Sequence, residues 1–223
     1  MDLTNKTYIV SGATTYLGRE VALELATKNA NIILAGLDYS ELEDVKATLS
    51  DTTGEHEIVL LEQSKEIDWL DVVQKIEDSY ESLNGIILVH SIFTDDKTVY
   101  NVSFNEFSEV MYEHVWGTYL GIRTLRPLLK IENDAKIINV IEPSFEEVFE
   151  RNLYYTVTGA IEALTHSTAI ELSREDVDVY ALSYRPTYKT TEEERANQKA
   201  IKKIKAIIDH DKDIPTGETI IIS

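Results

Sequence analysis

The sequence predicts a single α/β domain, spanning residues 1–223, in which helices cover both faces of a parallel sheet. Residues 7–18 have the pattern of a short buried strand, a tight turn and the start of a helix. Strand and helix signals then alternate along the whole chain, which is typical of a doubly wound parallel sheet. The segment 85–89, Gly-Ile-Ile-Leu-Val, is apolar throughout, as expected for a strand covered on both faces.

Each element follows from its own apolar pattern. Apolar runs too short for a helix predict strands, and the first run, residues 8–10, precedes Gly12, which permits a sharp turn. Apolar residues at helical spacing predict helices, as in Val21, Leu25 and Ala26. In chain order, further strands are expected at 31–35, 57–61, 85–89, 136–141, 177–183 and 219–222, and further helices around 42–49 and 67–76 and at 104–130, 153–172 and 191–208.

Composition excludes several classes of function. The chain has 40 acidic and 21 basic residues and a formal net charge of -19, which argues against nucleic acid and against an anionic membrane as partners. It has no cysteine, so disulfides, cysteine-based zinc sites and thiol nucleophiles are excluded, and we expect no bound metal. The N-terminus lacks an apolar signal segment and no apolar run is long enough for a membrane span, which predicts a cytoplasmic protein.

The turn after the first strand is the first candidate binding site. A strand, turn and helix of this kind direct free backbone N–H groups and the helix dipole at a phosphate group. Gly12 and Gly18 supply the first and last glycines of a Gly-x-x-x-Gly-x-Gly fingerprint, but Tyr16 stands at the middle glycine. With the spacing Gly-x-x-Gly-x-x-Gly the middle position is Thr15 instead. The turn therefore predicts the fold and leaves the ligand open.

Several motifs occur in an order known from one enzyme family. Residues 11–18 read Ser-Gly-Ala-Thr-Thr-Tyr-Leu-Gly, and residues 154–172 contain Ala-Leu-Thr and end in Ala-Ile-Glu-Leu. With these motifs the chain resembles the short-chain dehydrogenase/reductase family, whose active-site helix reads Tyr-x-x-x-Lys before the same motifs. The resemblance implies a Rossmann-like fold and NAD or NADP as the cofactor. Further matches are Val-Trp-Gly-Thr-Tyr at 115–119, Ile-Ile-Asn-Val at 137–140, Arg-Pro-Thr at 185–187 and Pro-Thr-Gly-Glu-Thr-Ile at 215–220.

The resemblance assigns positions to the family's catalytic tyrosine and lysine. This chain keeps the tyrosine but not the lysine. In the family the tyrosine exchanges a proton with the substrate oxygen while the nicotinamide passes a hydride, and the lysine lowers the pKa of the phenol. The tyrosine falls on Tyr154 and the lysine on Thr158, which carries no charge. Taking Tyr155 as the tyrosine places Gly159 at the lysine position. We therefore expect no cation to acidify the phenol, and favour a packed or interfacial aromatic role for Tyr154.

The serine and the asparagine of the family's site are replaced as well. The serine position falls on Ile141 or Glu142, with Ser144 slightly late, and the asparagine of the proton relay falls on His114. His114 could titrate near neutrality and replace a relay group, although a lone histidine on a long helix is more often structural. Glu142 places a carboxylate where a hydroxyl donor is needed, which leaves a role as base or as protonated acid. The candidate catalytic residues are Tyr154, Tyr155, His114 and Glu142.

The positions that would hold the cofactor are altered in the same way. The family's Asn-Asn-Ala-Gly reads His-Ser-Ile-Phe at 90–93, and the phenylalanine ring would fill a groove where close approach is required. Gly36 and Leu37 replace the residues that hold an NAD ribose or an NADP phosphate, while Asp38 could still reach a ribose hydroxyl. Gln63 stands where an aspartate would contact the adenine. The candidate cofactor residues are Gly12, Thr14, Thr15, Tyr16, Leu17, Gly18, Asp38, Gln63, His90 and Phe93.

Two further features concern the substrate lid and assembly. Residues 186–217 leave room for about one helix, whereas the family usually inserts extra helices there as a lid. The helices at 104–130 and 153–172 resemble the family's dimer contact, so we expect a homodimer or homotetramer, or a hetero-oligomer with a related active subunit. An apolar seam on the first helix supports this expectation. It consists of Tyr112, Trp116, Tyr119 and Ile122.

Three hypotheses for function follow. The leading hypothesis is a degenerate homologue, a pseudoenzyme or partner subunit without standard hydride transfer, which binds NAD(P) if it binds any cofactor. The second is a divergent NAD(P)-dependent oxidoreductase that acts on a carbonyl or alcohol through Tyr154 or Tyr155, assisted by His114 or Glu142. The third is a non-redox enzyme that reuses the cleft with His90, His114 and Glu142. The substrate, the pathway and the partner stay open.

Overall fold

The computed structural model of the protein confirms the predicted doubly wound sheet. It describes residues 2–80, 82–92, 94, 97–129, 134–141, 150–184, 190–209 and 214–222. The strands are β1 (Thr7–Ser11), β2 (Asn31–Gly36), β3 (His56–Leu60), β4 (Gly85–Val89), β5 (Ala135–Ile141), β6 (Val177–Tyr184) and β7 (Thr219–Ile222). The helices are α1 (Tyr16–Ala26), α2 (Tyr39–Thr48), α3 (Glu66–Ser79), α4 (Phe104–Val110), η1 (Met111–Trp116), α5 (Gly117–Leu129), α6 (Asn152–Leu172), η2 (Ser173–Glu175) and α7 (Thr190–Ile208).

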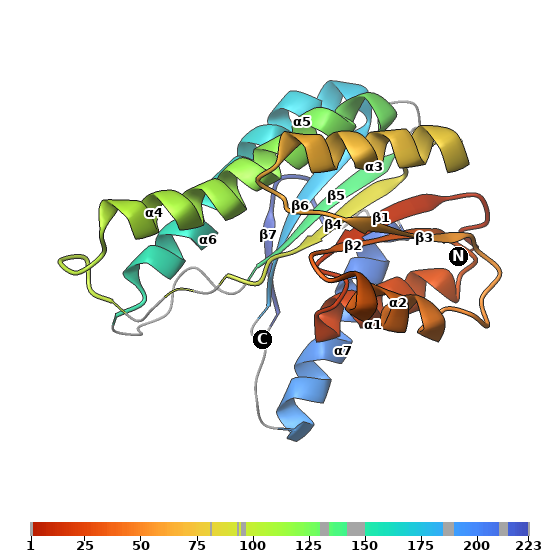
Figure 1. Ribbon diagram of the computed structural model, residues 1–223, viewed down its shortest axis with the longest axis horizontal. Coiled ribbons are helices and arrows are strands. Elements are labelled where there is room, and N and C mark those ends of the chain that lie inside the picture. The colour runs from red at the N-terminus through yellow and green to blue at the C-terminus, as the bar shows by residue number, and fades with distance from the viewer. Residues whose placement is uncertain are drawn as a thin grey trace.

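The strands form one parallel sheet in the order β3-β2-β1-β4-β5-β6-β7. The chain starts in the middle, winds outward to β3, returns to β4 beside β1 and winds outward to the other edge. Figure 1 shows α1, α2 and α7 on one face of this sheet and α3, α5 and α6 on the other. In such folds the ligand crevice lies outside the carboxyl ends of the strands where the strand order reverses. Here that point lies between β1 and β4.

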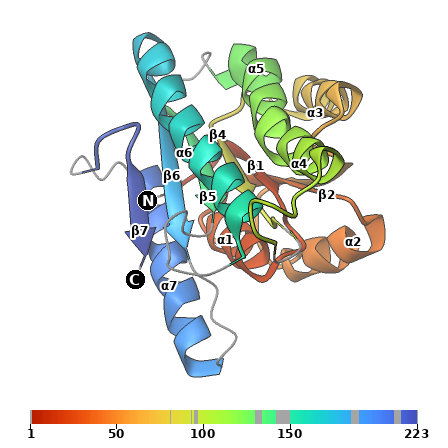
Figure 2. The same cartoon turned by 90° about the vertical axis from the view of Figure 1, so that its left-hand side faces the viewer.

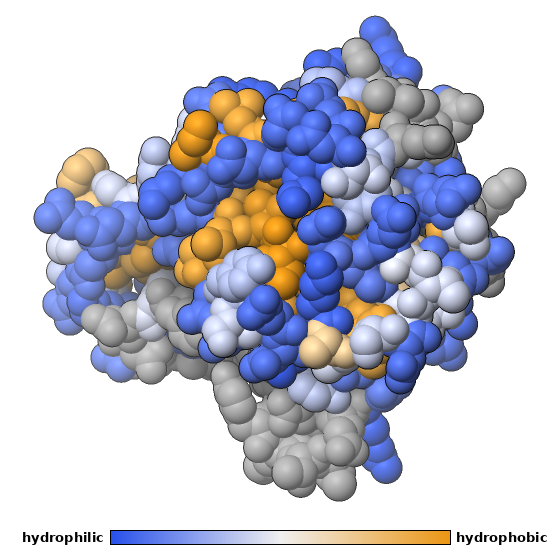
Figure 3. Space-filling model, turned by 45° about the vertical axis from the view of Figure 1, so that its right-hand side comes forward, coloured by the Kyte–Doolittle hydropathy of each residue, from blue (hydrophilic) through white to orange (hydrophobic). Residues whose placement is uncertain are grey.

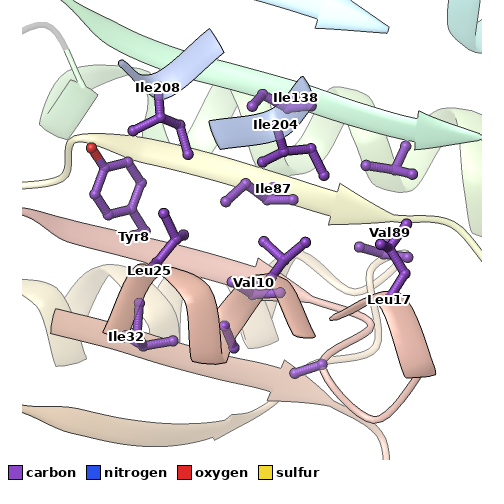
Figure 4. Close-up of a cluster of buried hydrophobic side chains, with 14 of the residues drawn as sticks. Tyr8, Val10, Leu17, Leu25, Ile32, Ile87, Val89, Ile138, Ile204 and Ile208 are labelled. Carbon is purple, nitrogen blue, oxygen red and sulfur yellow. The ribbon is translucent and has the colours of Figure 1, made fainter. Parts of the chain in front are cut away.

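Two apolar clusters, one on each face, hold the layers together. Figure 4 shows the first, in which Val10 of β1 and Ile87 of β4 lie beneath Ile204 of α7. The second contains Trp69 of α3, whose side chain is fully buried. Gly121 of α5 permits this packing, because a Cβ at that position would lie 2.7 Å from the Trp69 ring. Burial of one large apolar side chain contributes about 2 kcal/mol to the free energy of unfolding. The many buried side chains of the two clusters therefore hold the helices on both faces of the sheet.

The helix predicted at 104–130 runs as three consecutive segments. Its start carries a capping box, in which Ser103 accepts from the N–H of Glu106 and the Glu106 carboxylate accepts from the N–H of Ser103. After α4 the helix widens into the π-helix η1, and α5 continues it. π-helical turns are rare and occur frequently at functional sites, and this one contains His114. Apolar spacing does not separate a π turn from an α-helix, so the prediction missed it.

Within the described part of residues 186–217, α7 is the only helix, as predicted for a chain without extra lid helices. It packs back on α1, where Lys205 Nζ lies 3.8 Å from a carboxylate oxygen of Glu24. In the portion of the chain that the structure describes, no helix combines the length and apolar character needed to cross a membrane.

Candidate functional site

The turn between β1 and α1 keeps two glycines that its own backbone requires. Gly12 has a φ of +71°, and a Cβ there would overlap the carbonyl oxygen of Val89. A Cβ on Gly18 would overlap the carbonyl oxygen of Gly12. Tyr16 occupies the middle position with a side chain that is 51% exposed, and Leu17 beside it is buried in the core. The two glycines of the turn are therefore required by its own packing, and Tyr16 lies between them.

Thr15 stabilises this turn from within. Its hydroxyl donates to the C=O of Gly12 at 2.7 Å and accepts from the N–H of Gly18 at 3.0 Å, which caps α1. The N–H of Gly18 is thus already paired inside the chain. Beside it, the methyl group of Thr14 would lie 3.7 Å from a Cβ placed on Gly36, so this methyl group covers the end of β2.

The polar residues after β2 and β3 are engaged within the protein. Asp38 caps α2, and its Oδ1 accepts from the N–H of Glu41 at 2.9 Å. Gln63 Nε2 donates to Oγ of Ser11 at 2.7 Å, which draws the amide toward the end of β1. Asp38 remains exposed, whereas the amide nitrogen of Gln63 is held inside the crevice.

His90 follows β4, and His114 faces it from η1. The two side chains are 8% and 7% exposed, and their ring centroids lie 6.2 Å apart in an edge-to-face arrangement. Burial lowers the pKa of His90 to about 3, with a smaller effect from His114 in the same direction, and burial lowers the pKa of His114 to about 4. Both rings are therefore neutral at pH 7. The buried, neutral ring agrees with the structural role favoured for His114 over a role in a proton relay, because its surroundings disfavour the charged form.

Tyr154 of α6 lies in an apolar cluster. Only 1% of its surface is exposed, and the cluster includes Val157 of the same helix and Ile141 at the end of β5. Thr158, at the lysine position, is fully buried, and its hydroxyl lies 3.3 Å from the backbone carbonyl oxygens of both Tyr154 and Tyr155. The hydroxyl that replaces the lysine ammonium therefore points back to its own helix.

A cation does lie against Tyr154, and sequence reasoning missed it. The guanidinium carbon of Arg151 is 4.2 Å from the centroid of the Tyr154 ring. The spacing of three residues was the available signal, because side chains three apart lie on the same side of a helix. The sequence analysis considered a cation only at the lysine position, and this one lies on the opposite side of Tyr154 in the sequence. Arg151 approaches the ring face, where a cation is attracted to the negative part of the aromatic quadrupole.

Backbone contacts hold Arg151 in place. Lys97 and Arg151 form an isolated parallel bridge, and the N–H of Lys97 donates to the C=O of Glu150 at 2.6 Å. The Lys97 ammonium forms an ion pair with Glu106 of α4. These contacts fasten the segment after β4 to the start of α6, next to Tyr154.

The remaining candidate residues are only partly placed. The Tyr155 ring meets the Tyr154 ring edge-to-face with centroids 5.6 Å apart. Glu142 and Phe93, for which a carboxylate role and a groove-filling role were predicted, lie outside the described residues. Among the residues that are described, no group of three or more histidines, aspartates and glutamates is arranged to hold a metal ion.

The topology, the turn and the residues around the crevice define an α/β protein of the Rossmann type with the layout of a dehydrogenase. Residues 12–218 match a family model described as enoyl-(acyl carrier protein) reductase. The chain belongs to the short-chain dehydrogenase/reductase family, which confirms the resemblance noted in the sequence.

Curated relatives carry the name of oxidoreductases. "Uncharacterized oxidoreductase YxbG" of Bacillus subtilis (strain 168) is 25% identical over 182 residues, which cover 81% of this chain and 66% of that protein. "Uncharacterized oxidoreductase SSP0419" of Staphylococcus saprophyticus is 25% identical over 188 residues, which cover 82% and 79%. The chain thus spans slightly less than two thirds of the first of these relatives.

Solved structures share the fold over nearly the whole chain. A short chain dehydrogenase from Salmonella enterica serovar Typhi has a TM-score of 0.88 at 19% identity, with 99% of this chain and 97% of that chain covered. The 3-ketoacyl-(acyl-carrier-protein) reductase from Brucella melitensis, complexed with NADH, has a TM-score of 0.86 at 20% identity, with 99% and 98% covered. At these identities the likeness establishes the fold and leaves the substrate open.

Proposed function

We propose that this protein is a short-chain dehydrogenase/reductase homologue that has lost standard hydride transfer and acts as a non-catalytic or partner subunit. The observation that carries the proposal is the packing of Tyr154, which is 1% exposed and has the uncharged Thr158 at the lysine position. A general acid must come within hydrogen-bond reach of the substrate oxygen. A phenol enclosed by core side chains does not meet this condition.

The residues of the crevice also fit a nicotinamide dinucleotide poorly. Tyr16 adds a side chain at the middle glycine, and the amide nitrogen of Gln63 already bonds Ser11. His90 fills a buried position that is asparagine in the family. We therefore assign no step of hydride transfer to this site, and we propose that any dinucleotide binds weakly.

The proposed partner surface comprises Tyr112, Trp116 and Tyr119 of η1 and α5, which we call the α5 surface. Ile122, the fourth residue of the predicted seam, is buried in the second cluster and does not belong to it. Figure 2 shows α5 and α6 neighbouring each other on the same face of the sheet. Tyr112 and Trp116 stack with ring centroids 6.5 Å apart, and the guanidinium carbon of Arg123 lies 5.6 Å from the Trp116 ring. Tyr119 is 51% exposed. Aromatic residues and arginine are enriched at interface cores, so this surface suits a homo-oligomer or a related active subunit.

A divergent NAD(P)-dependent oxidoreductase is the second candidate. Arg151 favours it, because a guanidinium 4.2 Å from the Tyr154 ring centroid supplies the positive charge that Thr158 lacks. In this alternative the tyrosine would act as the acid on a carbonyl substrate after the side chains around it have opened.

Turnover with NADH and NADPH distinguishes the two candidates. We expect purified protein to show no dinucleotide-dependent reduction of ketone or 3-ketoacyl thioester substrates. Turnover that Tyr154→Phe abolishes and Arg151→Gln reduces would establish the second candidate instead.

Sedimentation tests the partner surface. Trp116→Glu should lose an oligomer that the control variant Ile221→Glu, at an exposed site on β7, retains. A monomer at all concentrations, with no related protein co-purifying from the native host, would contradict the partner role.

A further inference from the structure

The open edge of β3 is a second unpartnered feature, separate from the α5 surface. In the described sheet β3 pairs with β2 alone. The N–H of Ile32 donates to the C=O of Glu55 at 3.1 Å, and the N–H of Leu61 donates to the C=O of Gly36 at 2.9 Å. Because residues of a parallel ladder alternate, the odd-numbered residues of β3 bond to β2. The outward N–H and C=O groups belong to His56, Ile58 and Leu60.

The edge strand exposes an aliphatic side chain at its carboxyl end. Within residues 58–61, Val59 and Leu61 are buried in the second cluster and Ile58 packs against the first, which leaves Leu60, 49% exposed, as the open aliphatic side chain. Leu37, which directly follows the β2 partner of Leu60, is 71% exposed. Figure 3, in which this side of the molecule is turned toward the viewer, shows a hollow of apolar surface between hydrophilic margins. Natural edge strands usually carry lysine, proline or a bulge that prevents pairing with another chain.

The surroundings of this edge are strongly acidic. Residues 38–80, which contain α2, β3 and α3, hold 13 acidic residues and three lysines. Two of these lysines are paired, Lys75 with Glu57 at 3.5 Å and Lys65 with Glu62 at 2.6 Å. The remaining carboxylates give this side of the protein a negative potential that attracts cationic segments.

We propose that the β3 edge binds an extended, basic segment of another protein by strand addition. The outward backbone groups supply hydrogen bonds, Leu60 and Leu37 contact the apolar side chains of the segment, and the acidic margins select the lysine or arginine residues between them. A second copy of this chain is a poor occupant, because two such edges would bring their negative charges together. This inference goes beyond the proposed function and is independent of whether hydride transfer occurs.

The test uses a capped peptide of about eight residues in which lysine and valine alternate, a length that matches one strand. It is titrated into the ¹⁵N-labelled full chain at low and high salt. Two control peptides accompany it: alternating lysine and proline, which keeps the charge but cannot form strand hydrogen bonds, and alternating glutamate and valine. We expect saturable shifts at the amides of His56, Ile58 and Leu60, at least tenfold weaker binding of the lysine–proline peptide, and no binding of the glutamate peptide.

Two variants at one position separate strand addition from surface attraction. Leu60→Pro removes an outward N–H while leaving the ladder to β2 intact, as proline is tolerated on edge strands. It should weaken the lysine–valine peptide at least tenfold. Leu60→Ser keeps the N–H and removes only the aliphatic contact, so it should weaken binding of the peptide less than Leu60→Pro does. If Leu60→Pro does not fold, hydrogen exchange decides in the unaltered protein: bound peptide should slow exchange at His56 and Ile58.

Several results would overturn the proposal. Equal binding of the lysine–valine and lysine–proline peptides would mean that charge alone attracts them. Shifts confined to other elements, unchanged affinity in a folded Leu60→Pro variant, or unchanged exchange at His56 and Ile58 would exclude strand addition. If the protein dimerises without peptide and the Leu60→Pro variant is monomeric, this edge joins two copies of the chain instead.

Discussion

The buried pair His90 and His114 should make the protein acid-sensitive in a way that substitution can isolate. Both pKa values are lowered in the folded state, to about 3 and about 4, below the value near 6.5 of an unfolded chain. Between these limits the unfolded state binds protons that the folded state does not bind. The stability contributed by neutral burial is therefore complete above about pH 6.5 and is lost as the pH falls.

The magnitude at pH 5 follows from the unfolded value alone, because both folded pKa values lie below 5. At this pH the solution is about 1.5 units below the pKa of each histidine in the unfolded chain. At 1.36 kcal/mol per unit, each histidine lowers the free energy of unfolding by about 2 kcal/mol. The pair together should lose about 4 kcal/mol. That is a large part of the stability of an ordinary domain, which is about 5–15 kcal/mol.

The assay is urea unfolding of the unaltered protein and of the double variant His90→Asn, His114→Asn across this pH range. Asparagine does not titrate, and the family resemblance implies it at both positions. The many carboxylates are common to both proteins, so their effect cancels in the difference. We expect the free energy of unfolding to fall about 4 kcal/mol further between pH 7.5 and 5 in the unaltered protein than in the double variant. Parallel pH profiles would refute the buried, neutral state of the pair.

Substitutions at four further positions test the site and the turn. Thr158→Lys should cost about 3 kcal/mol in urea unfolding and restore no turnover, because its position is fully buried; a stable variant that reduces ketones would contradict the packing of the site. Gly12→Ala should lower the free energy of unfolding by about 2 kcal/mol, because the new Cβ would overlap a carbonyl oxygen, whereas Tyr16→Gly should lower it by under about 1 kcal/mol. Equal losses of stability in the two variants would argue against our account of the turn. Arg151→Gln removes the contact with Tyr154 and should lower the free energy of unfolding by about 1 kcal/mol, while Arg151→Lys should lower it less. An unchanged melting temperature in both variants would exclude a stabilising contact.

The architecture was predictable because it depends on local patterns repeated along the chain. The strand expected at 85–89 is β4 (Gly85–Val89) as predicted, and the one expected at 177–183 extends by one residue to Tyr184. A buried parallel strand needs a continuous apolar run, and such a run is visible in any single sequence. That α7 is the helix within the described part of residues 186–217 followed from segment length in the same way.

The site was less predictable because its chemistry depends on contacts between distant residues. Nothing in the sequence around Gln63 indicates that its amide turns to Ser11, 52 positions away. The lowered pKa of His114 results from burial, which the residue type alone does not reveal. Arg151 was overlooked because the family motif directs attention to the residue four positions after the tyrosine, while the cation lies three positions before it.

Calorimetric titration with NADH and NADPH tests the account most directly, since every proposed loss converges on the crevice at the end of β1 and β4. We predict no saturable binding up to about 1 mM of either dinucleotide. A dissociation constant of about 1–10 µM, with a matching rise in the thermal midpoint, would contradict the proposal that this crevice has given up its cofactor.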